Sequence, residues 1–437
     1  MKRYATVVLV LLFGVFLGGS YAIAGEVDVL VNKLVEKGVL TQGEAQQMLT
    51  EAKEDARKEI AQGKNEILPK WIQSTKFGGD IRIRYQGENK TGDKHRDRGR
   101  LRLRYGFETK PNDLMKVGFR MATGENKASS SNLPGGPEQT STNQSFTGMY
   151  QNKSIWLDQA YVEYRPFGNK DWMVLKDMKL TGGKFANPFY TTDLVWDSDI
   201  NPEGGYVQFT PKIGPANTFF TFGFMPIGES GSDSNDPFLF AMQGGFSSTA
   251  FSRPYKLGVS YFDYDNVKGN AWNTYSTNYS PTLNNSLDGT SLLKYDFNIL
   301  EVVGEFSPVD LTIFDNTMPL TIQGDYANNL AGDHPTNHAA WLAGLKLGKA
   351  KEKGTWEAFW NYREIGQNSV LATISDSDFH LGGVAAKGNK FGVTYAIMPN
   401  STVSGAYFIT DPYKCDTAVT GTSRHISIWQ LDWVTKF

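Results

Sequence analysis

Alternation of apolar and charged residues over one stretch constrains this chain more than any other feature. Between Gly78 and Glu108 the sequence carries two runs in which nearly every second residue is apolar or aromatic. Successive side chains of a β-strand point to opposite faces, so each run predicts a strand with one apolar and one charged face. The apolar face holds Ile81, Ile83, Tyr85, Leu101, Leu103, Tyr105 and Phe107, and the charged face holds Arg82, Arg84, Arg100, Arg102 and Arg104.

Two classes of protein fit this alternating pattern, and the start of the chain indicates which one applies. A soluble sandwich buries the apolar face, whereas a transmembrane β-barrel turns it to lipid and lines a watery lumen with the charges. Residues 1–24 have the features of a signal peptide: a positive end, an apolar core and the small-x-small site Ala22-Ile23-Ala24. The core is shorter than the roughly 20 residues of a membrane-spanning helix. We therefore expect an exported chain and a β-barrel.

Residues 25–64 differ from the rest of the chain because their apolar residues recur at helical spacing. Gly38 interrupts the pattern, and Thr41 with Glu44 then forms a capping-box signature that starts a second helix. We expect a helix–break–helix segment on the periplasmic side. Its apolar stripe predicts either a short self-associating bundle or a plug inside the barrel. Residues 65–77 read as a linker in which Trp71 lies at the membrane interface.

The remaining residues, 78–437, predict an all-β, antiparallel transmembrane β-barrel of about sixteen strands. Alternating runs recur up to Phe437, and short connections such as Pro399-Asn400 alternate with long polar ones such as 123–153, 265–296 and 365–388. Short periplasmic turns and long outer loops are typical of outer-membrane barrels. Beyond the opening pair, the expected strands are 116–122, 154–165, 172–184, 205–210, 218–225, 238–246, 255–264, 297–306, 319–326, 339–348, 355–363, 389–398, 402–410 and 425–437.

The connection at residues 185–204 is the candidate for a loop that narrows the pore. Unlike the other long connections it carries large apolar residues, which a loop folded into a barrel needs in order to pack on the wall. Its acids would oppose the strand cations and create a transverse field. The predicted constriction residues are Asp193, Asp197, Asp199 and Glu203. The predicted pore-lining residues are Arg82, Arg84, Arg100, Arg102, Arg104, Arg120 and Lys184. Alternatively, the acids cap turns or pair locally with arginines.

Three segments resemble the putative porins of Gram-negative, notably deltaproteobacterial, outer membranes. They are the helical leader at 34–41, the strand Gly79-Asp80-Ile81-Arg82-Ile83-Arg84-Tyr85, and the loop motif Thr192-Asp193-Leu194-Val195-Trp196-Asp197. The terminal Phe437 is similar to the assembly signal of bacterial outer-membrane proteins. The resemblance implies a sixteen-stranded passive diffusion porin, a homotrimer by analogy with porins of that size, surrounded by outer-membrane lipid. It does not imply a particular solute.

Composition and motifs bear on the competing functions. The formal net charge of −2 gives no support for nucleic-acid binding, and the single cysteine, Cys415, excludes an intrachain disulfide and a cysteine-rich metal site. We expect no catalytic residues, no metal and no cofactor, because no nucleophile elbow, phosphate-binding loop or His-Glu-x-x-His pattern is present. The histidines, including His380, are expected on polar surfaces. The main alternative to a porin is a barrel that acts as a sleeve or scaffold for another outer-membrane component, such as an electron-transfer lipoprotein. A barrel hydrolase is a further alternative.

Overall fold

The computed structural model divides the chain into two units, Met1–Gln73 and Ser74–Phe437. In the first unit, residues 43–47 are helical, and the predicted capping box forms: the Thr41 amide donates to Glu44 Oε2 at 2.9 Å. This unit ends in a short helix, α4 (Lys70–Gln73). The predicted signal peptide and most of the predicted helical segment lie outside the described residues. The structure describes residues 35, 41, 43–47, 50, 54, 69–127, 136–137, 139–168, 171, 173–214, 216–229, 236–250, 252–270, 285–290, 292–313, 316–333, 336–414 and 424–437.

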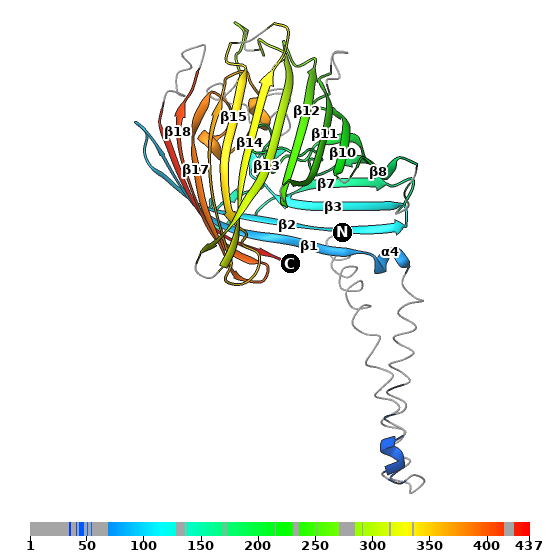
Figure 1. Cartoon of the computed structure of the whole chain (residues 1–437). Helices are drawn as coiled ribbons and strands as arrows, with labels where there is room; N and C mark the ends of the chain where they lie inside the picture. Colours follow the sequence, from blue (N-terminus) through cyan, green and yellow to red (C-terminus); the bar gives the residue numbers. More distant parts are fainter. Residues whose placement is uncertain are drawn as a thin grey trace, which may run out of the picture. The chain divides into compact units, whose positions relative to one another are not determined.

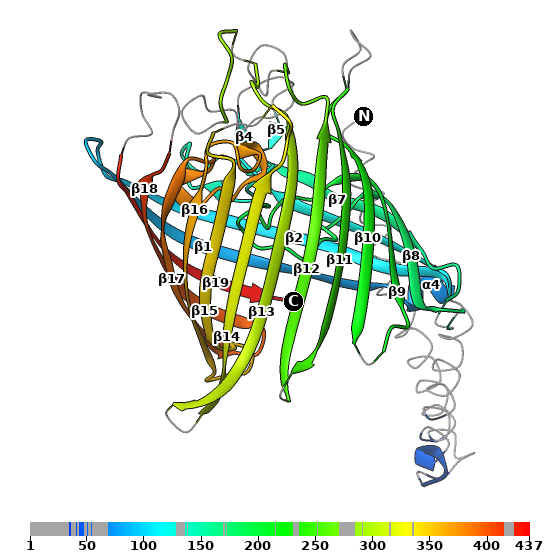
Figure 2. The same cartoon turned by 45° about the horizontal axis from the view of Figure 1, so that its top comes forward.

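The second unit is a closed antiparallel β-barrel of sixteen strands (Figures 1 and 2). Each wall strand pairs with the next along the chain, and β1 pairs with the last strand, β19, which closes the ring. The closure extends to the final residue, because the Phe437 amide donates to the Gly79 carbonyl at 3.1 Å. The wall strands are β1 (Lys76–Lys90), β2 (Arg96–Asn112), β3 (Met115–Thr123), β7 (Ile155–Tyr164), β8 (Leu175–Lys184), β9 (Glu203–Pro211), β10 (Asn217–Pro226), β11 (Phe238–Ala250), β12 (Arg253–Asp265), β13 (Phe297–Ile313), β14 (Asn316–Asn329), β15 (Ala339–Gly348), β16 (Trp356–Ile365), β17 (Ala386–Met398), β18 (Ser401–Pro412) and β19 (Ile426–Lys436).

These strands confirm the predicted fold class and the predicted strand count. Every predicted strand overlaps one wall strand, and the barrel begins at Lys76, two residues before the predicted start. Three further strands lie in the connection between β3 and β7: β4 (Asn126–Lys127), β5 (Gly136–Pro137) and β6 (Gln144–Ser145). β6 pairs with Arg100 and Leu101 of β2, beyond the point where β3 ends. It therefore covers an edge of the wall that would otherwise be unpaired.

The two faces of the wall have the polarity that the alternation predicts. On β1, Ile83 and Tyr85 are exposed on the outer surface, whereas Arg84 between them is only 5% exposed. The same alternation continues farther round the ring, where Leu345 is exposed between Gly344 and Lys346 of β15. An apolar outer belt and a polar inner face suit a wall with lipid outside and water inside. Within the part of the chain that the structure describes, no helix combines the length and the apolar character that a membrane span requires.

A charge placed on the outer belt is expected to destabilise the barrel in a bilayer. Leu345 lies near the middle of β15 and pairs with Ile322 and Trp360 on its neighbours. Because lipid cannot solvate a guanidinium, Leu345→Arg should lower the free energy of unfolding from lipid vesicles by about 2–4 kcal/mol. Urea titration of tryptophan fluorescence measures this change. Glu352→Arg, in the exposed turn between β15 and β16, is the matched control and should change it by under about 1 kcal/mol. Equal losses for both variants would contradict the assigned outer face.

Candidate functional site

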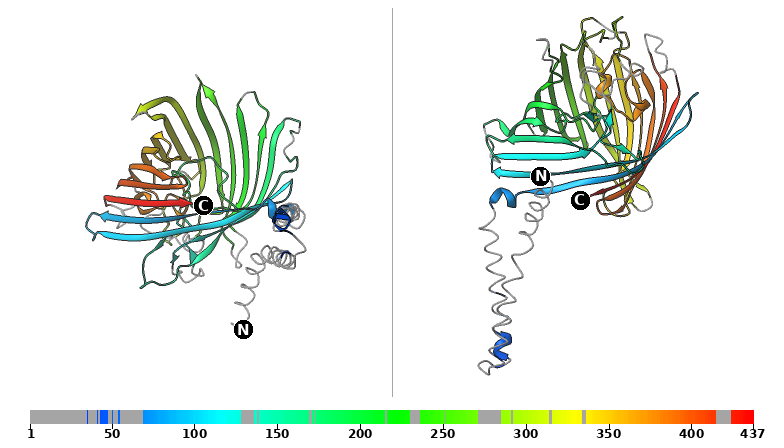
Figure 3. Two further views of the ribbon diagram at one scale, coloured as in Figure 1. Left: turned by 90° about the horizontal axis from the view of Figure 1, so that it is seen from below. Right: turned by 180° about the vertical axis from the view of Figure 1, so that it is seen from behind.

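The connection between β8 and β9, residues 185–202, packs against strand faces opposite the lipid-facing belt. Its apolar side chains are buried, and Leu194 and Val195 are fully inaccessible. The Trp196 ring lies 5.8 Å from the ring of Phe262, whose side chain belongs to the buried face of β12. The buried apolar residues of this loop are Phe185, Phe189, Leu194, Val195, Trp196 and Ile200. They form one cluster with residues of β10–β19, which fixes the loop to these strands. Figures 2 and 3 show the strands of this part of the ring.

Polar contacts add to this attachment at the loop's first turn. The Thr192 hydroxyl donates to Asp325 Oδ2 on β14 at 2.6 Å, and the Thr191 hydroxyl donates to Glu301 on β13. The Tyr190 amide donates to Gln243 Oε1 on β11 at 2.8 Å. Because both carboxyl residues are almost fully buried, the hydroxyl groups satisfy acceptors that water does not reach.

A second loop, residues 366–385 between β16 and β17, takes part in the same arrangement. It contains two short helices, η1 (Ala372–Ile374) and η2 (Phe379–Leu381). Leu371 and Phe379 are each 1% exposed, in the same apolar cluster as the first loop. The amide of Asp197 in the first loop donates to the Ile374 carbonyl at 2.7 Å. The two loops therefore form one packed unit.

Arg363 on β16 connects both loops to the wall. Its side chain is fully buried, and Nη1 donates to the Asp193 carbonyl of the first loop at 3.0 Å. The same nitrogen lies 3.0 Å from Asp376 Oδ2 of the second loop. The guanidinium also lies 4.3 Å from the centre of the Phe379 ring. A buried cation needs such partners to offset the loss of its hydration.

Acidic side chains of the two loops meet where the loops touch. Asp197 Oδ2 accepts the Ser377 amide at 2.8 Å, close to Asp376. Burial, together with the neighbouring carboxyls of Asp376 and Asp199, raises the pKa of Asp197 well above its usual range. At Asp193 burial acts in the same direction, but Lys390, 3.1 Å away, and Arg363 outweigh it and lower the pKa. Burial and neighbouring charges therefore shift the pKa values of these two loop carboxyls in opposite directions.

The arginines of β1 and β2 form the opposite side of the site, called the arginine wall here: Arg82, Arg84, Arg100, Arg102 and Arg104. Arg84 pairs with Asp432 of β19 at 2.7 Å and with Asp378 of the second loop at 2.9 Å. Arg104 pairs with Asp80 at 2.6 Å and lies 3.6 Å from Asp199 of the first loop. The loops are therefore connected by charge pairs to both sides of the ring.

A polar cavity of about 240 Å³ remains between the loops and the arginine wall. Since water occupies about 30 Å³ in the liquid, this volume equals that of about eight water molecules. Its charged lining residues are Arg82, Arg84, Arg102, Lys390, Asp193, Asp197, Asp199, Asp376, Asp378 and Asp432. It brings three of the predicted pore-lining arginines together with three of the four predicted loop acids.

The other predicted residues lie elsewhere. Arg100 is on the same face as Arg84, its partner in the β-sheet register, but does not line the cavity. Glu203 was wrongly assigned to the loop: it is the first residue of β9, and its carboxylate pairs with Lys184 Nζ at 2.8 Å. His380 was wrongly expected on a polar surface, because it is 1% exposed and its Nδ1 lies 2.9 Å from the Thr410 hydroxyl.

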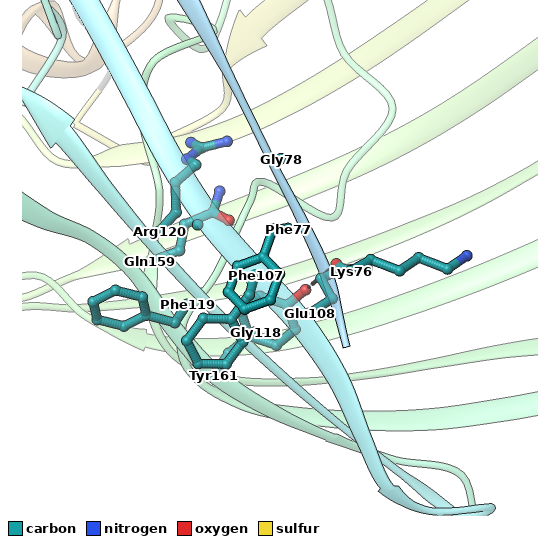
Figure 4. Close-up of a pocket in the computed structure, with 11 residues that line it drawn as sticks. Lys76, Phe77, Gly78, Phe107, Glu108, Gly118, Phe119, Arg120, Gln159 and Tyr161 are labelled. Carbon is teal, nitrogen blue, oxygen red and sulfur yellow. Dashed lines mark hydrogen bonds between the residues drawn. The ribbon is translucent and has the colours of Figure 1, made fainter. Parts of the chain in front are cut away.

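Arg120 belongs to a second cavity of about 290 Å³ near the start of β1, shown in Figure 4. Arg120 and Gln159 extend side by side there, and the Arg120 guanidinium pairs with Asp158. The Tyr161 hydroxyl donates to Glu108 Oε1 at 2.6 Å, and its ring covers Gly118. A Cβ at Gly118 would lie 2.3 Å from that ring, so only glycine fits at this position.

Comparison with known proteins assigns the family. The family model described as "Putative porin" matches residues 88–294 and 293–437, which together make up most of the chain. The chain belongs to this porin family. A search of the curated proteins finds no match.

Solved structures agree with the barrel of this porin. The high-pH structure of OprB from Pseudomonas putida has a TM-score of 0.53 at 12% identity, covering 87% of this chain and 97% of that chain. The low-pH structure of the same protein has a TM-score of 0.47 at 11% identity over the same shares. A triple mutant of the Rhodopseudomonas blastica porin has a TM-score of 0.41 at 9% identity, covering 83% of this chain and all of that one. The likeness to OprB establishes the fold alone; family and fold together indicate an outer-membrane channel.

The second loop and Arg363 are the site residues that sequence reasoning missed. The loop appears polar overall, but Val370, Leu371, Ile374 and Phe379 give it apolar residues comparable with those of the first loop. That composition is the signal that would have identified it. No feature of the neighbouring sequence distinguishes Arg363 from the other inward-facing residues of β16, because it follows the same alternation.

The raised pKa of Asp197 predicts a pH-dependent ion preference. Below this pKa the carboxyl is neutral, and it ionises as pH rises through the raised value. Ionisation adds negative charge to the cavity, so anion preference in a salt gradient should fall as pH rises through the raised pKa of Asp197. Reversal potentials of purified protein in planar bilayers measure this.

Asp197→Asn should abolish that pH dependence, because the titrating group is removed. Asp193→Asn is the matched control: the lowered pKa of Asp193 keeps it ionised throughout this transition, so its loss should shift the reversal potential equally at every pH. A variant Asp197→Asn that retained the wild-type pH dependence would contradict the assignment.

Proposed function

We propose that this porin lets small hydrophilic solutes and ions diffuse passively through a water-filled passage between the two loops and the arginine wall. The observation that carries the proposal is the polar cavity lined by Arg82, Arg84 and Arg102 on one side and by loop carboxyls on the other. An inward-packed loop unit leaves a solute little space except along this charged strip. Pore selectivity then follows from the size and charge of the narrowest part.

The mechanism relies on the transverse arrangement of charge. Cations of β1 and carboxylates of the loops line the same cavity of about 240 Å³, and Arg84 and Asp378 approach to 2.9 Å. The field between the two signs would orient dipolar solutes and disfavour long apolar ones. Because both signs are present and several are paired, the ion preference should be weak. It should also depend on salt, since screening acts over about 8 Å at physiological ionic strength.

The proposal also includes the N-terminal segments and the oligomeric state of the protein. Residues 1–24 would be removed as a signal peptide, residues 25–64 would lie in the periplasm, residues 65–77 would link them to the barrel, and three copies would assemble in outer-membrane lipid. The capping box at Thr41 and Glu44 supports the helical character of the segment. The alternative role as a sleeve for another component fits less well, because loop residues already occupy much of one side of the ring.

Loosening the loop unit should widen the channel. Trp196 is 5% exposed and packs on Phe189 and Phe262, so Trp196→Ala leaves a cavity that costs about 3–5 kcal/mol in a protein core. Wild-type protein in a planar bilayer should give stepwise channels with weak ion preference. The variant should give larger and noisier steps.

Trp341→Ala is the matched control, because that indole lies on the lipid-facing belt of β15 and should leave conductance unchanged. A wild-type protein that inserts without conducting would contradict the proposed function. Identical conductance for wild type and Trp196→Ala would contradict the role of the loops.

A further inference from the structure

Two guanidinium groups of the arginine wall differ from the others in their partners. Arg84, Arg102 and Arg104 each pair with at least one carboxylate within 3.0 Å. Among the described residues, Arg82 and Arg100 have no carboxylate within 4 Å and bond only to neutral oxygens. A positive group without a negative partner in a partly dehydrated site is a binding site for an anion.

The two groups lie next to each other. In the register of β1 and β2, Arg82 pairs with Arg102 and Arg84 pairs with Arg100. Arg82 and Arg100 are therefore diagonal neighbours on the same face, a spacing within reach of long side chains. One anion a few atoms long can contact both, or can pass from one to the other along the wall.

Their present hydrogen bonds are ones that an anion could replace or extend. Arg82 Nη2 donates to Asn143 Oδ1 at 2.6 Å, and its Nε has no partner among the described residues although it is buried. Arg100 donates to Gln86 Oε1 at 3.3 Å and to Ser141 Oγ at 3.4 Å, both long, and its Nε is likewise buried without a partner. Distances above 3.2 Å mark weak bonds, so these donors retain capacity.

The carboxyls around the cavity are already engaged elsewhere. Asp80 forms ion pairs with Arg102 and Arg104. Asp378 and Asp432 both form ion pairs with Arg84. Asp193 is paired with Lys390, and Asp376 with Arg363. Asp197 accepts the Ser377 amide, and burial beside other carboxyls raises its pKa and so disfavours its charged form. Among the described residues, Arg82 and Arg100 therefore have no carboxylate at ion-pair distance, although Asp199 and Asp432 act on Arg82, and Asp378 and Glu125 on Arg100, from farther away.

We propose that Arg82 and Asn143, which line this cavity, form a binding site for the carboxylate of small organic acids as they cross the pore. Ser141 and Arg100 lie next to them, because Asn143 Nδ2 donates to Ser141 Oγ at 3.2 Å and Arg100 Nη2 donates to the same oxygen at 3.4 Å. A guanidinium presents parallel N–H groups that match a carboxylate in a bidentate fashion, which favours this anion over chloride. The cavity volume of about 240 Å³ limits the solute to a few carbon atoms. The inference rests on the proposed porin function and adds a solute class to it.

The test is a block experiment on single channels of the full-length protein. Conductance is recorded in potassium chloride while potassium succinate is added to one side; succinamide, of the same length but uncharged, is added in a parallel series. Succinate should reduce the chloride current in a saturable way, and succinamide should not. Arg82→Gln should raise the half-blocking concentration about tenfold or more, because a charge-assisted bond is lost.

Two further variants separate a binding site from a general electric field. Arg120→Gln removes the same charge from the same inner wall, but its guanidinium is paired with Asp158 and does not line this cavity, so the half-blocking concentration should stay within about twofold. Arg82→Lys keeps the charge and loses the planar pair of donors, so it should give an intermediate value. Arg100→Gln is a second test in case the Arg82→Gln protein does not assemble. It should also raise the half-blocking concentration of succinate.

The outcomes distinguish this inference from the function on which it rests. If Arg82→Gln and Arg120→Gln weakened the succinate block equally, the block would come from a diffuse electric field. That result would contradict the proposed binding site. Wild-type channels that conduct chloride but show no succinate block would overturn the binding site and leave the porin function intact. Protein that inserts but never conducts would overturn the porin function and, with it, the binding site.

Discussion

The buried guanidinium of Arg363 is the interaction on which the arrangement inside this barrel depends. One nitrogen, Nη1, reaches both the Asp193 carbonyl of the first loop and Asp376 of the second, while the planar group stacks near Phe379. Removing one partner of such a buried pair typically costs about 3–5 kcal/mol, because the remaining charge is left without hydration. The contact joins both loops to β16, in addition to their apolar packing and the hydrogen bonds of the first loop.

Apolar packing and charged residues shape different sides of the lumen. Leu194, Val195 and Trp196 pack in the apolar cluster that joins the loop unit to the strands β10–β19. The carboxyls of the same unit face the arginine wall across the cavity. Because the packed side is apolar, the proposed passage follows the charged side, where the field between opposite charges is stronger than in bulk solvent.

The sequence predicted the wall better than the site, for physical reasons. Period-two alternation is a local property, so all sixteen strands and the inward direction of Arg82 and Arg84 follow from neighbouring residues alone. The large apolar residues of the first loop identified it because a surface loop has no use for them. By contrast, Asp376, Asp378 and Arg363 meet their partners across the ring, at sequence separations that no local pattern encodes. Glu203 was misassigned because a loop end and a strand start look alike when both are polar.

Hydrogen exchange of backbone amides, followed by mass spectrometry on the folded protein, tests the central claim most directly. The amides of Asp197 and Ser377 are bonded within the loop unit at 2.7 and 2.8 Å. Peptides from 190–200 and 372–378 should therefore exchange on the order of a hundredfold more slowly than the exposed segment 146–151. Such protection is the result expected of loops packed against the wall. Exchange of these peptides as fast as that of 146–151 would show that the loops are not held there, and would contradict the account.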